Sequence, residues 1–280
     1  MFSAFLLLFL CGLLCFSLLT PTVTAHTSPY KINSLQKLKK AAHKKHLSAK
    51  AQKEIINESS PETLIQYTKY VDQEVSDIVN SSEPDEIHYR TDGCTTEIYR
   101  ADIDALSSFE LVIEDGPEKS FSEKAASAIK GMFLDEVSAA KNGEEKWKSA
   151  NGKTKEDKGN HYFTAKYKRY IGPGFAQMMT ENHYNVTSDC KIKERYGESW
   201  VDTFYGVTAS LYGDPGHTIE DKWAKKEGED AHIKTRFTVK YSAYHSTSYV
   251  SYYERTTIKL LKKDKKNKRV KVKHSWKAIN

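Results

Sequence analysis

The chain has 280 residues, a formal net charge of +6 and 29% charged residues. Its four cysteines form no Cys-x-x-Cys pair and no Cys/His spacing typical of structural zinc, and no phosphate-binding glycine loop occurs. We therefore expect neither a metal nor a cofactor. Apart from one apolar run at the N-terminus, no segment approaches the roughly 20 apolar residues of a membrane-spanning helix. A protein with several membrane-spanning helices is therefore excluded.

The N-terminal residues have the pattern of a secretory signal peptide. Residues 5–19 are almost wholly apolar, and small Val23 and Ala25 follow at the −3 and −1 positions of a cleavage site. We expect residues 1–25 to be removed after Ala25, so that the mature protein begins at His26 and is secreted. A retained anchor is the alternative, because no Lys or Arg precedes the apolar run.

Two cysteines, Cys94 and Cys190, remain after removal of this signal. In an oxidising extracellular space they would close a loop of about 97 residues, which stabilises a fold by on the order of 4–5 kcal/mol. We expect this disulfide, and two separate buried thiols are the alternative.

Charge is distributed unevenly along the chain. Residues 26–60 carry eight lysines against two glutamates, a charge of +6, and residues 259–280 carry ten Lys or Arg against one aspartate, a charge of +9. The middle, residues 61–258, therefore carries −9. Basic ends of this kind favour an acidic partner, such as an anionic cell-envelope polymer or a membrane surface, and no specific nucleic-acid motif is present. Alternatively, the ends dock on the protein's own acidic middle or keep it soluble.

The first half of the mature chain is expected to be helical with short strands. Residues 33–57 begin with a capping-box spacing and have a thin apolar stripe, which predicts a basic helical arm or pro-segment over residues 26–58. Residues 60–79 predict a stronger helix, with Ser60 as its cap. The pattern predicts further elements in an α+β region at residues 59–145: strands at 86–90, 96–100 and 109–114, and a helix at 120–141.

The second half is expected to be an antiparallel β domain over residues 161–280. A linker or exposed loop at residues 146–160 precedes it, because that stretch is rich in glycine and charge and poor in apolar residues. Apolar and polar residues alternate in 233–243, which predicts a strand with one buried face and one wet face. The expected strands are 161–170, 184–195, 200–212, 232–245, 248–261 and 268–276. The predicted fold class is therefore α+β, with N-terminal helices and short strands before a large antiparallel meander or sandwich.

No catalytic motif fixes a chemistry, so we expect a secreted, non-enzymatic protein. It would bind anionic cell-envelope or extracellular polymers through its basic N- and C-terminal segments. The residues expected to contact the polymer are Lys262, Lys263, Lys265, Lys266, Lys268, Arg269, Lys271 and Lys273.

Two other functions remain open from the sequence. The Ser/Thr/Tyr alternation in 238–257 is compatible with a β-hairpin pore-forming toxin, although Glu254 and Arg255 interrupt the two faces that lipid would need uncharged. The other is a secreted cell-wall or glycan hydrolase, although no nucleophile motif accompanies its candidate groups. These groups are Asp214, His217 and Glu198.

Overall fold

The structure is a computed structural model that describes residues 30–44, 46–89, 93–118, 153–205, 209–211, 213, 216–243 and 246–279. The predicted signal peptide and the predicted helix at 120–141 lie outside these residues. From Ile32 onward the described residues belong to one unit. Within the described ranges, no helix combines the length and the apolar character needed to cross a membrane.

The predicted α+β class is confirmed, with helices first and antiparallel strands after them. The helices are α2 (Leu35–Ala42), α3 (Ala49–Glu58) and α4 (Pro61–Ser81). The first strands are β1 (Glu86–Tyr89), β2 (Thr95–Asp102), β3 (Ser107–Pro117), β4 (Lys153–Asp157), β5 (Gly159–Ile171), β6 (Gly174–Val186) and β7 (Ile192–Tyr205). The last strands are β8 (Ala209–Leu211), β9 (Gly216–Asp221), β10 (Trp223–Ala224), β11 (Asp230–Ala243), β12 (Ser246–Asp264) and β13 (Arg269–Ile279).

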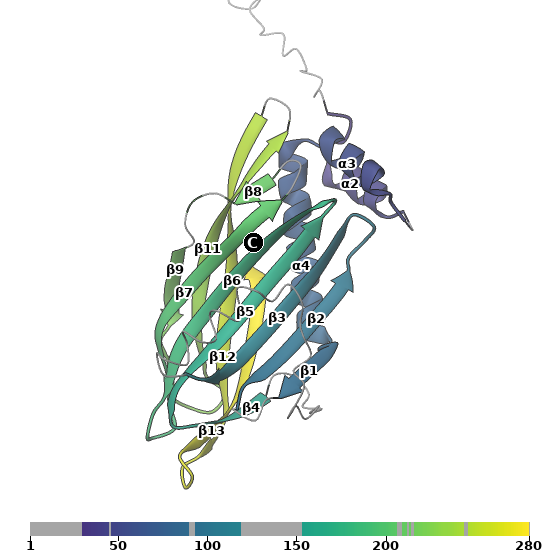
Figure 1. Cartoon of the computed structure of the whole chain (residues 1–280). Coiled ribbons are helices and arrows are strands. Elements are labelled where there is room, and N and C mark those ends of the chain that lie inside the picture. The colour runs from purple at the N-terminus through teal and green to yellow at the C-terminus, as the bar shows by residue number, and fades with distance from the viewer. Residues whose placement is uncertain are drawn as a thin grey trace, which may run out of the picture. The chain divides into compact units, whose positions relative to one another are not determined.

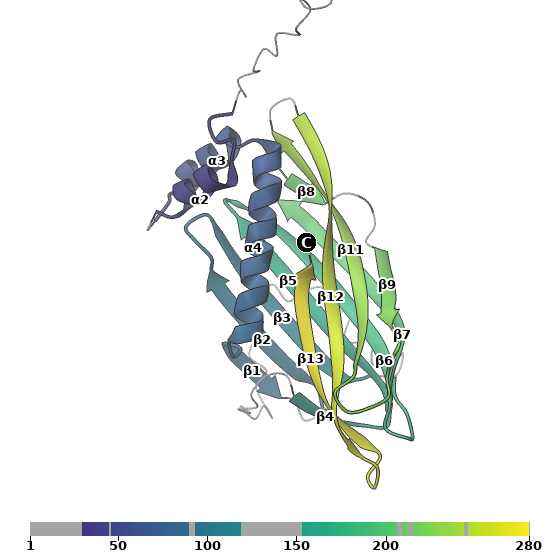
Figure 2. The same cartoon turned by 180° about the vertical axis from the view of Figure 1, so that it is seen from behind.

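The described strands form two antiparallel sheets (Figure 1). One has seven strands in the order β1-β2-β3-β5-β6-β7-β10, and the other has six, with the path β4-β13-β12-β11-β8 and β9 beside β11. Helix α4 lies alongside β13, and both cover the same face of the seven-stranded sheet (Figure 2). The core therefore lies between one sheet and a second layer built from the other sheet and α4.

Aromatic and charged side chains join these two layers. Tyr167 of β5 packs against Trp276 of β13, with ring centroids 4.8 Å apart. Arg169 of β5 forms an ion pair of 2.7 Å with Asp72 of α4. Strand β5 thus contacts both components of the second layer.

Helix α4 forms as its sequence predicts. The Ser60 hydroxyl accepts a hydrogen bond from the Thr63 backbone N–H at 3.2 Å, and Pro61 occupies the first helical position, where its missing N–H costs nothing. The helix then buries an apolar face against the sheets: Leu64, Tyr67, Val71 and Val75.

The single helix predicted at 33–57 is instead two helices, α2 and α3. The second begins because the Ser48 hydroxyl accepts a hydrogen bond from the Ala51 backbone N–H at 3.3 Å, which caps a new helix. Three members of the thin apolar stripe are buried in the core, namely Leu38, Ala42 and Ile56. Leu35 is half-buried and Ala49 is exposed.

Strands β1, β2 and β3 confirm the short strands predicted in the first half, but two predictions further along are wrong. The strand expected at 184–195 crosses a turn, because β6 ends at Val186 and β7 begins at Ile192. In that turn the Thr187 hydroxyl accepts a hydrogen bond from the Lys191 backbone N–H at 3.0 Å. The alternation of apolar and polar residues does not predict strand β6, because several of its buried positions are polar: Thr180, Asn182 and His183.

The second correction concerns residues 153–160, which were expected in a linker. Residues 153–157 form β4, which pairs with β13, and β5 begins at Gly159. Strand β4 lies at a sheet edge and is densely charged, a composition that protects edges but resembles a loop in sequence. Strands β3 and β5, on either side of the expected linker, are neighbours in one sheet.

The C-terminal meander follows the predicted alternation. Strands β11, β12 and β13 pair in that order with long antiparallel registers. Of the residues that this alternation assigns to the core face, Val250 is half-buried, and the side chains of Tyr241 and Ala243 lie outside the described part. The other nine are buried: Ile233, Phe237, Val239, Tyr252, Ile258, Leu260, Val270, Val272 and Trp276.

The predicted disulfide is wrong, because Cys94 and Cys190 are buried without a bond between them. The Cys94 sulfur lies 3.6 Å from the Tyr162 hydroxyl, whereas the Cys190 sulfur lies 3.7 Å from the Asp264 carbonyl oxygen. Three strand spacings, about 14 Å in total, separate β2 from β6, and a disulfide spans Cα atoms at most about 7 Å apart. The alternative of two separate buried thiols is confirmed.

Candidate functional site

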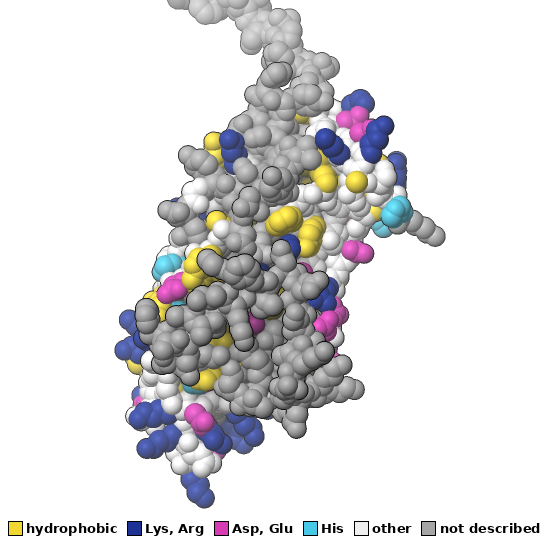
Figure 3. All heavy atoms as spheres, in the orientation of Figure 1, with side chains coloured by type: hydrophobic (Ala, Val, Ile, Leu, Met, Phe, Trp, Pro, Cys, Tyr) yellow, Lys and Arg dark blue, Asp and Glu magenta, His cyan; other side chains and the backbone are white. Residues whose placement is uncertain are grey.

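The residues predicted to contact a polymer lie on the hairpin of β12 and β13 (Figure 1). We call residues 259–273 the basic hairpin. It carries nine Lys or Arg side chains against one carboxylate, Asp264, a formal charge of +8. In the space-filling view, Lys and Arg side chains gather at this end of the chain's described part (Figure 3). Six of the eight predicted residues are exposed, and Lys263 and Lys273 are half-buried.

The strand register places lysines directly opposite one another on the solvent face of the six-stranded sheet. Lys271 of β13 lies opposite Lys262 of β12 on one side and opposite Lys155 of β4 on the other. Lys273 lies opposite Lys259. Directly opposed residues have Cβ atoms only about 4.5–5.5 Å apart, and like charges at that distance destabilise a sheet. We call these five residues the lysine ladder.

Lys155 is the ladder member that sequence reasoning missed, because it lies in the expected linker. No local signal marks this strand, because all five residues of KTKED are polar, although in the structure Glu156 is buried and its two neighbours are exposed. Only the pairing of β4 with β13 brings Lys155 beside the hairpin.

Carboxylates offset part of the charge of the basic hairpin. Arg269 forms an ion pair with Asp157, and the Lys259 ammonium lies 3.9 Å from the Asp230 carboxylate. Four ladder lysines have no carboxylate within 4.0 Å among the residues that the structure describes: Lys155, Lys262, Lys271 and Lys273.

Hydrogen bonds fix the turn of the basic hairpin. The Asp264 carboxylate accepts from the Asn267 backbone N–H at 3.1 Å and from its side-chain amide at 2.7 Å, and these bonds lower the pKa of Asp264. Lys268 adopts a left-handed conformation with φ of 53°, and its carbonyl oxygen accepts from the Lys158 N–H at 3.0 Å. The lysines are therefore presented from a defined backbone.

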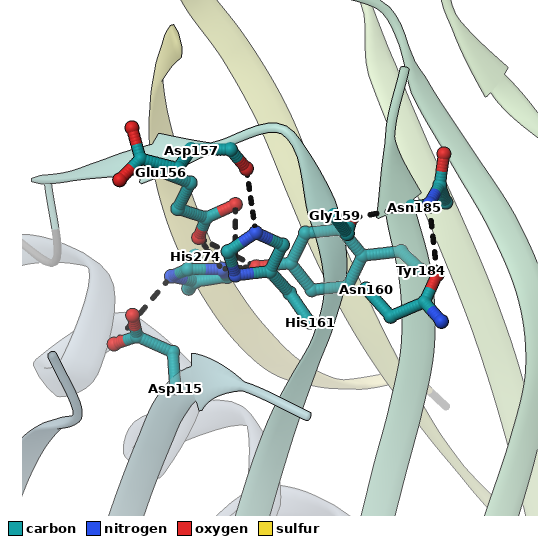
Figure 4. A network of polar contacts seen from close by, with 9 residues as sticks. All are labelled: Asp115, Glu156, Asp157, Gly159, Asn160, His161, Tyr184, Asn185 and His274. Atoms are coloured by element: carbon teal, nitrogen blue, oxygen red, sulfur yellow. Dashed lines mark hydrogen bonds and ion pairs between the residues drawn. The ribbon is translucent and has the colours of Figure 1, made fainter. Parts of the chain in front are cut away.

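A second group of polar side chains is buried between the sheets beside the lysine ladder (Figure 4). Glu156 and His274 directly follow the ladder residues Lys155 and Lys273, so their side chains point inward where the lysines point outward. The group includes residues from β3, β4, β5, β6 and β13, and thus from both sheets. We call it the buried cluster, and its members are Asp115, Glu156, His161, Tyr184 and His274.

Tyr184 connects two other members of the buried cluster. Its hydroxyl donates to Glu156 Oε1 at 2.5 Å and lies 3.0 Å from His274 Nε2. Burial, followed by the negative charge of Glu156, holds the pKa of Tyr184 well above its usual value. The pKa of His274 is lowered to about 3, mainly because burial disfavours the imidazolium and secondly because His161 is close. The Tyr184 hydroxyl therefore keeps its proton, and His274 is neutral.

A different histidine, His183, is surrounded by carboxylates at the other face of β6. Its Nδ1 lies 2.7 Å from Glu118 and its Nε2 lies 2.6 Å from Glu181. Burial lowers the pKa of His183, but the bonds to Glu181 and Glu118 outweigh this effect, so that its pKa is raised. Arg195 pairs with the same Glu118 at 2.7 Å, so that carboxylate lies between two basic side chains.

The candidate hydrolase groups do not converge within the described residues, and Asp214 lies outside those residues. Glu198 is exposed on β7, opposite Glu181 of β6. The His217 ring lies against Gly197. Because consecutive strand residues point to opposite faces, His217 and Glu198 lie on different sides of β7.

The basic hairpin and the buried cluster are thus the two candidate ligand-binding sites in the described part of the chain. The pairing of β4 with β13 adds Lys155 to the lysine ladder beside this hairpin and brings Glu156 into the buried cluster. No protein family, characterised protein or solved structure matches this chain.

Proposed function

We propose that the protein is exported and binds a linear anionic polymer of the extracellular space or cell envelope through the lysine ladder. The observation that carries this proposal is the row of Lys155, Lys271 and Lys262 across three strands. Like charges placed directly opposite one another are a cost to the folded sheet. An anionic ligand relieves that cost, whereas the free protein bears it.

The spacing of the ladder suits a polymer better than a small anion. Neighbouring strands are about 4.8 Å apart, and residues two apart on a strand are separated by about 6.8 Å. A chain with a charged group on each repeating unit therefore meets several ammonium groups at once. Each exposed contact contributes only about 0–1 kcal/mol, so affinity depends on their number and falls as salt replaces them.

Export is supported by the apolar run at residues 5–19 and the small residues before His26. In that location the accessible polyanions are acidic polysaccharides and polyol phosphates, and the protein acts as a binding module rather than an enzyme. The N-terminal lysines form the second basic segment of the chain. They lie at the opposite end of the unit from the hairpin turn, which makes them a natural control (Figure 2).

The test compares two variants of equal charge change, with heparin as the probe. The hairpin variant replaces four exposed lysines by glutamine: Lys155, Lys262, Lys266 and Lys271. The control variant makes the same replacement at four exposed lysines of the N-terminal segment: Lys40, Lys44, Lys50 and Lys53.

Fluorescence anisotropy with labelled heparin would measure the affinity from about 50 mM to about 500 mM salt. We expect the wild-type affinity to fall steeply with salt. The hairpin variant should bind at least about tenfold more weakly, with a slope of log K against log salt reduced by about 3, because each lost ammonium releases one fewer counterion. The control variant should stay close to the wild type.

Thermal unfolding without ligand provides an independent measurement. Removal of the opposed charges should leave the hairpin variant at least as stable as the wild type at low salt. Equal loss of heparin binding in both variants, or a wild-type affinity that does not change with salt, would contradict the proposal.

A further inference from the structure

The hydrogen bonds of the buried cluster determine where its two imidazoles carry their protons. The Tyr184 hydroxyl uses its O–H to donate a hydrogen bond to Glu156, so it accepts a hydrogen bond from His274 Nε2–H. His161 Nε2 lies 2.8 Å from the Asp157 carbonyl oxygen, which only accepts, so this nitrogen also carries its proton. An imidazole whose one ring proton is on Nε2 has a lone pair on Nδ1.

These two lone pairs face carboxylates instead of donors. His274 Nδ1 lies 3.8 Å from Asp115 Oδ1, and His161 Nδ1 lies 4.0 Å from Glu156 Oε2. Both distances are too long for a hydrogen bond, and neither nitrogen has a hydrogen-bond partner among the described residues. The two histidine side chains are only 1% and 7% exposed, so bulk water does not compensate them. A cation bound between such an imidazole nitrogen and a carboxylate would satisfy both acceptors at once.

We propose that Asp115, Glu156 and His274 bind a Zn²⁺ ion, with His161 as the neighbouring fourth donor. One ligand atom from each of the first three residues lies within 4.8 Å of the other two. Zinc binds imidazole nitrogen and carboxylate oxygen at about 2.0–2.2 Å. An ion at those distances from His274 Nδ1 and Asp115 Oδ1 subtends an angle of about 130°, which small side-chain shifts bring to tetrahedral geometry.

The surroundings match those of protein zinc ligands. A metal-bound histidine typically donates its other ring N–H to a carbonyl, a carboxylate or a comparable acceptor, which fixes its tautomer. His161 does so to the Asp157 carbonyl, and His274 does so to the hydroxyl that is itself bonded to Glu156. Two imidazoles with two carboxylates favour zinc over Mg²⁺ or Ca²⁺, which prefer all-oxygen sites.

The proposed ion has a structural role. Asp115 and His161 belong to the seven-stranded sheet, whereas Glu156 and His274 belong to the six-stranded sheet. A bound ion would therefore fasten the two sheets together at the end that carries the lysine ladder. The site is enclosed, as structural zinc sites are, and it does not depend on what the ladder binds.

The second cluster that contains a histidine shows the opposite arrangement. Carboxylate oxygens lie 2.7 Å and 2.6 Å from the two nitrogens of His183, so an imidazolium there offsets their negative charge without a metal ion. Glu198, the third acidic member of that cluster, is exposed on β7. A substitution in this cluster therefore serves as the control for zinc binding at the buried cluster.

The test begins with the secreted full-length protein, dialysed against a chelator and titrated with ZnCl₂ by calorimetry. We expect one Zn²⁺ per chain and a higher unfolding temperature in the presence of zinc. Asp115→Asn should weaken zinc binding by at least about 100-fold, because loss of a ligand costs no less than loss of the group that orients it. Glu198→Gln should bind zinc as the wild type does.

If Asp115→Asn did not fold, its zinc affinity could not be compared with that of the wild type. A second measurement therefore uses the wild type alone. X-ray absorption at the zinc edge of the 1:1 complex should show nitrogen and oxygen ligands at about 2.0–2.1 Å, including histidine. No stoichiometric binding to the wild type, equal binding to Asp115→Asn, or a bound ion without histidine would overturn the proposal.

Discussion

Charged side chains buried between the sheets and helix α4 differ in how they are compensated. Asp72 accepts from Arg169 at 2.7 Å and from the Tyr167 hydroxyl at 2.8 Å, so its charge has a direct partner. Burial still raises the pKa of Asp72 despite that cation. Glu254 is equally buried, and its Oε2 accepts only a neutral donor, the Trp276 ring N–H, at 3.0 Å. Burial raises the pKa of Glu254 to about 8.

This difference predicts how Glu254→Gln changes the pH dependence of stability. Below pH 4.5, the usual value for glutamate, the folded and unfolded states both hold the proton. Between pH 4.5 and about 8 only the unfolded state releases it, so the wild type loses stability as pH rises, by on the order of a few kcal/mol. Glutamine has no proton to lose and still accepts from Trp276.

Chemical denaturation of the wild type and the variant at several pH values would measure this effect. Relative to the wild type, Glu254→Gln should gain stability steadily through that pH window. Glu83→Gln, at an exposed position, is the control and should give no such gain. Parallel stability curves for Glu254→Gln and the wild type would show that Glu254 is ionised in the folded protein.

The sequence predicts the helices and strands whose buried face is apolar. It does not predict the strands whose buried face carries polar residues. Helix α4 and strands β11 to β13 follow their periodicity because each buries an unbroken apolar set. Strand β6 carries Asn182 inward, where it bonds to Thr256 at 2.7 Å, so its alternation disappears from the sequence. Strand β4 is not predicted, because its charged residues resemble those of a loop.

Of the two candidate sites, one can be predicted from the sequence and the other cannot. The basic hairpin is a continuous charge run, so the sequence predicts it, whereas the position of the ladder residue Lys155 depends on pairing across strands. The buried cluster was not predictable, because Asp115, Glu156 and His274 have no motif spacing. Their meeting point is a property of the sheet order, which no local pattern encodes.

The turn between β5 and β6 allows a test of how α3 is held. Gly172 has φ of 58°, and a Cβ there would lie 2.2 Å from Cδ1 of buried Ile56. Gly172→Ala should destabilise the protein by about 2–4 kcal/mol, through left-handed strain and overpacking together. Gly228→Ala, at φ of 93° with open space around it, should cost only the strain.

A double-mutant cycle separates the two effects at Gly172. Ile56→Val removes the atom that the new methyl group would meet, so the double variant should be less destabilised than the sum of the single changes. Additive unfolding free energies would mean that Ile56 does not pack on this turn.

For the molecule as a whole, the structure places its two basic segments apart. Helices α2 and α3 lie at one end of the unit and the turn of the basic hairpin lies at the other (Figures 1 and 2). Each end offers positive charge, while the middle of the chain is acidic. The hairpin differs from the helical end because its lysines oppose one another in register.

Mass spectrometry of the exported protein tests the proposed processing. We expect a mature chain that begins at His26. Under denaturing conditions without reductant, iodoacetamide should modify both Cys94 and Cys190, since the structure holds them in separate places. Modification that occurs only after reduction would show that the two thiols pair in the secreted protein, contrary to the structure.

Lysine footprinting on a complex with heparin tests the central claim most directly. An amine-reactive ester would label the protein with and without saturating heparin, and mass spectrometry would quantify each lysine. We expect heparin to suppress labelling at Lys155, Lys262 and Lys271, while Lys40 and Lys50 of the N-terminal segment keep their reactivity. Protection of the N-terminal lysines with an unprotected ladder, or no protection anywhere, would contradict this account.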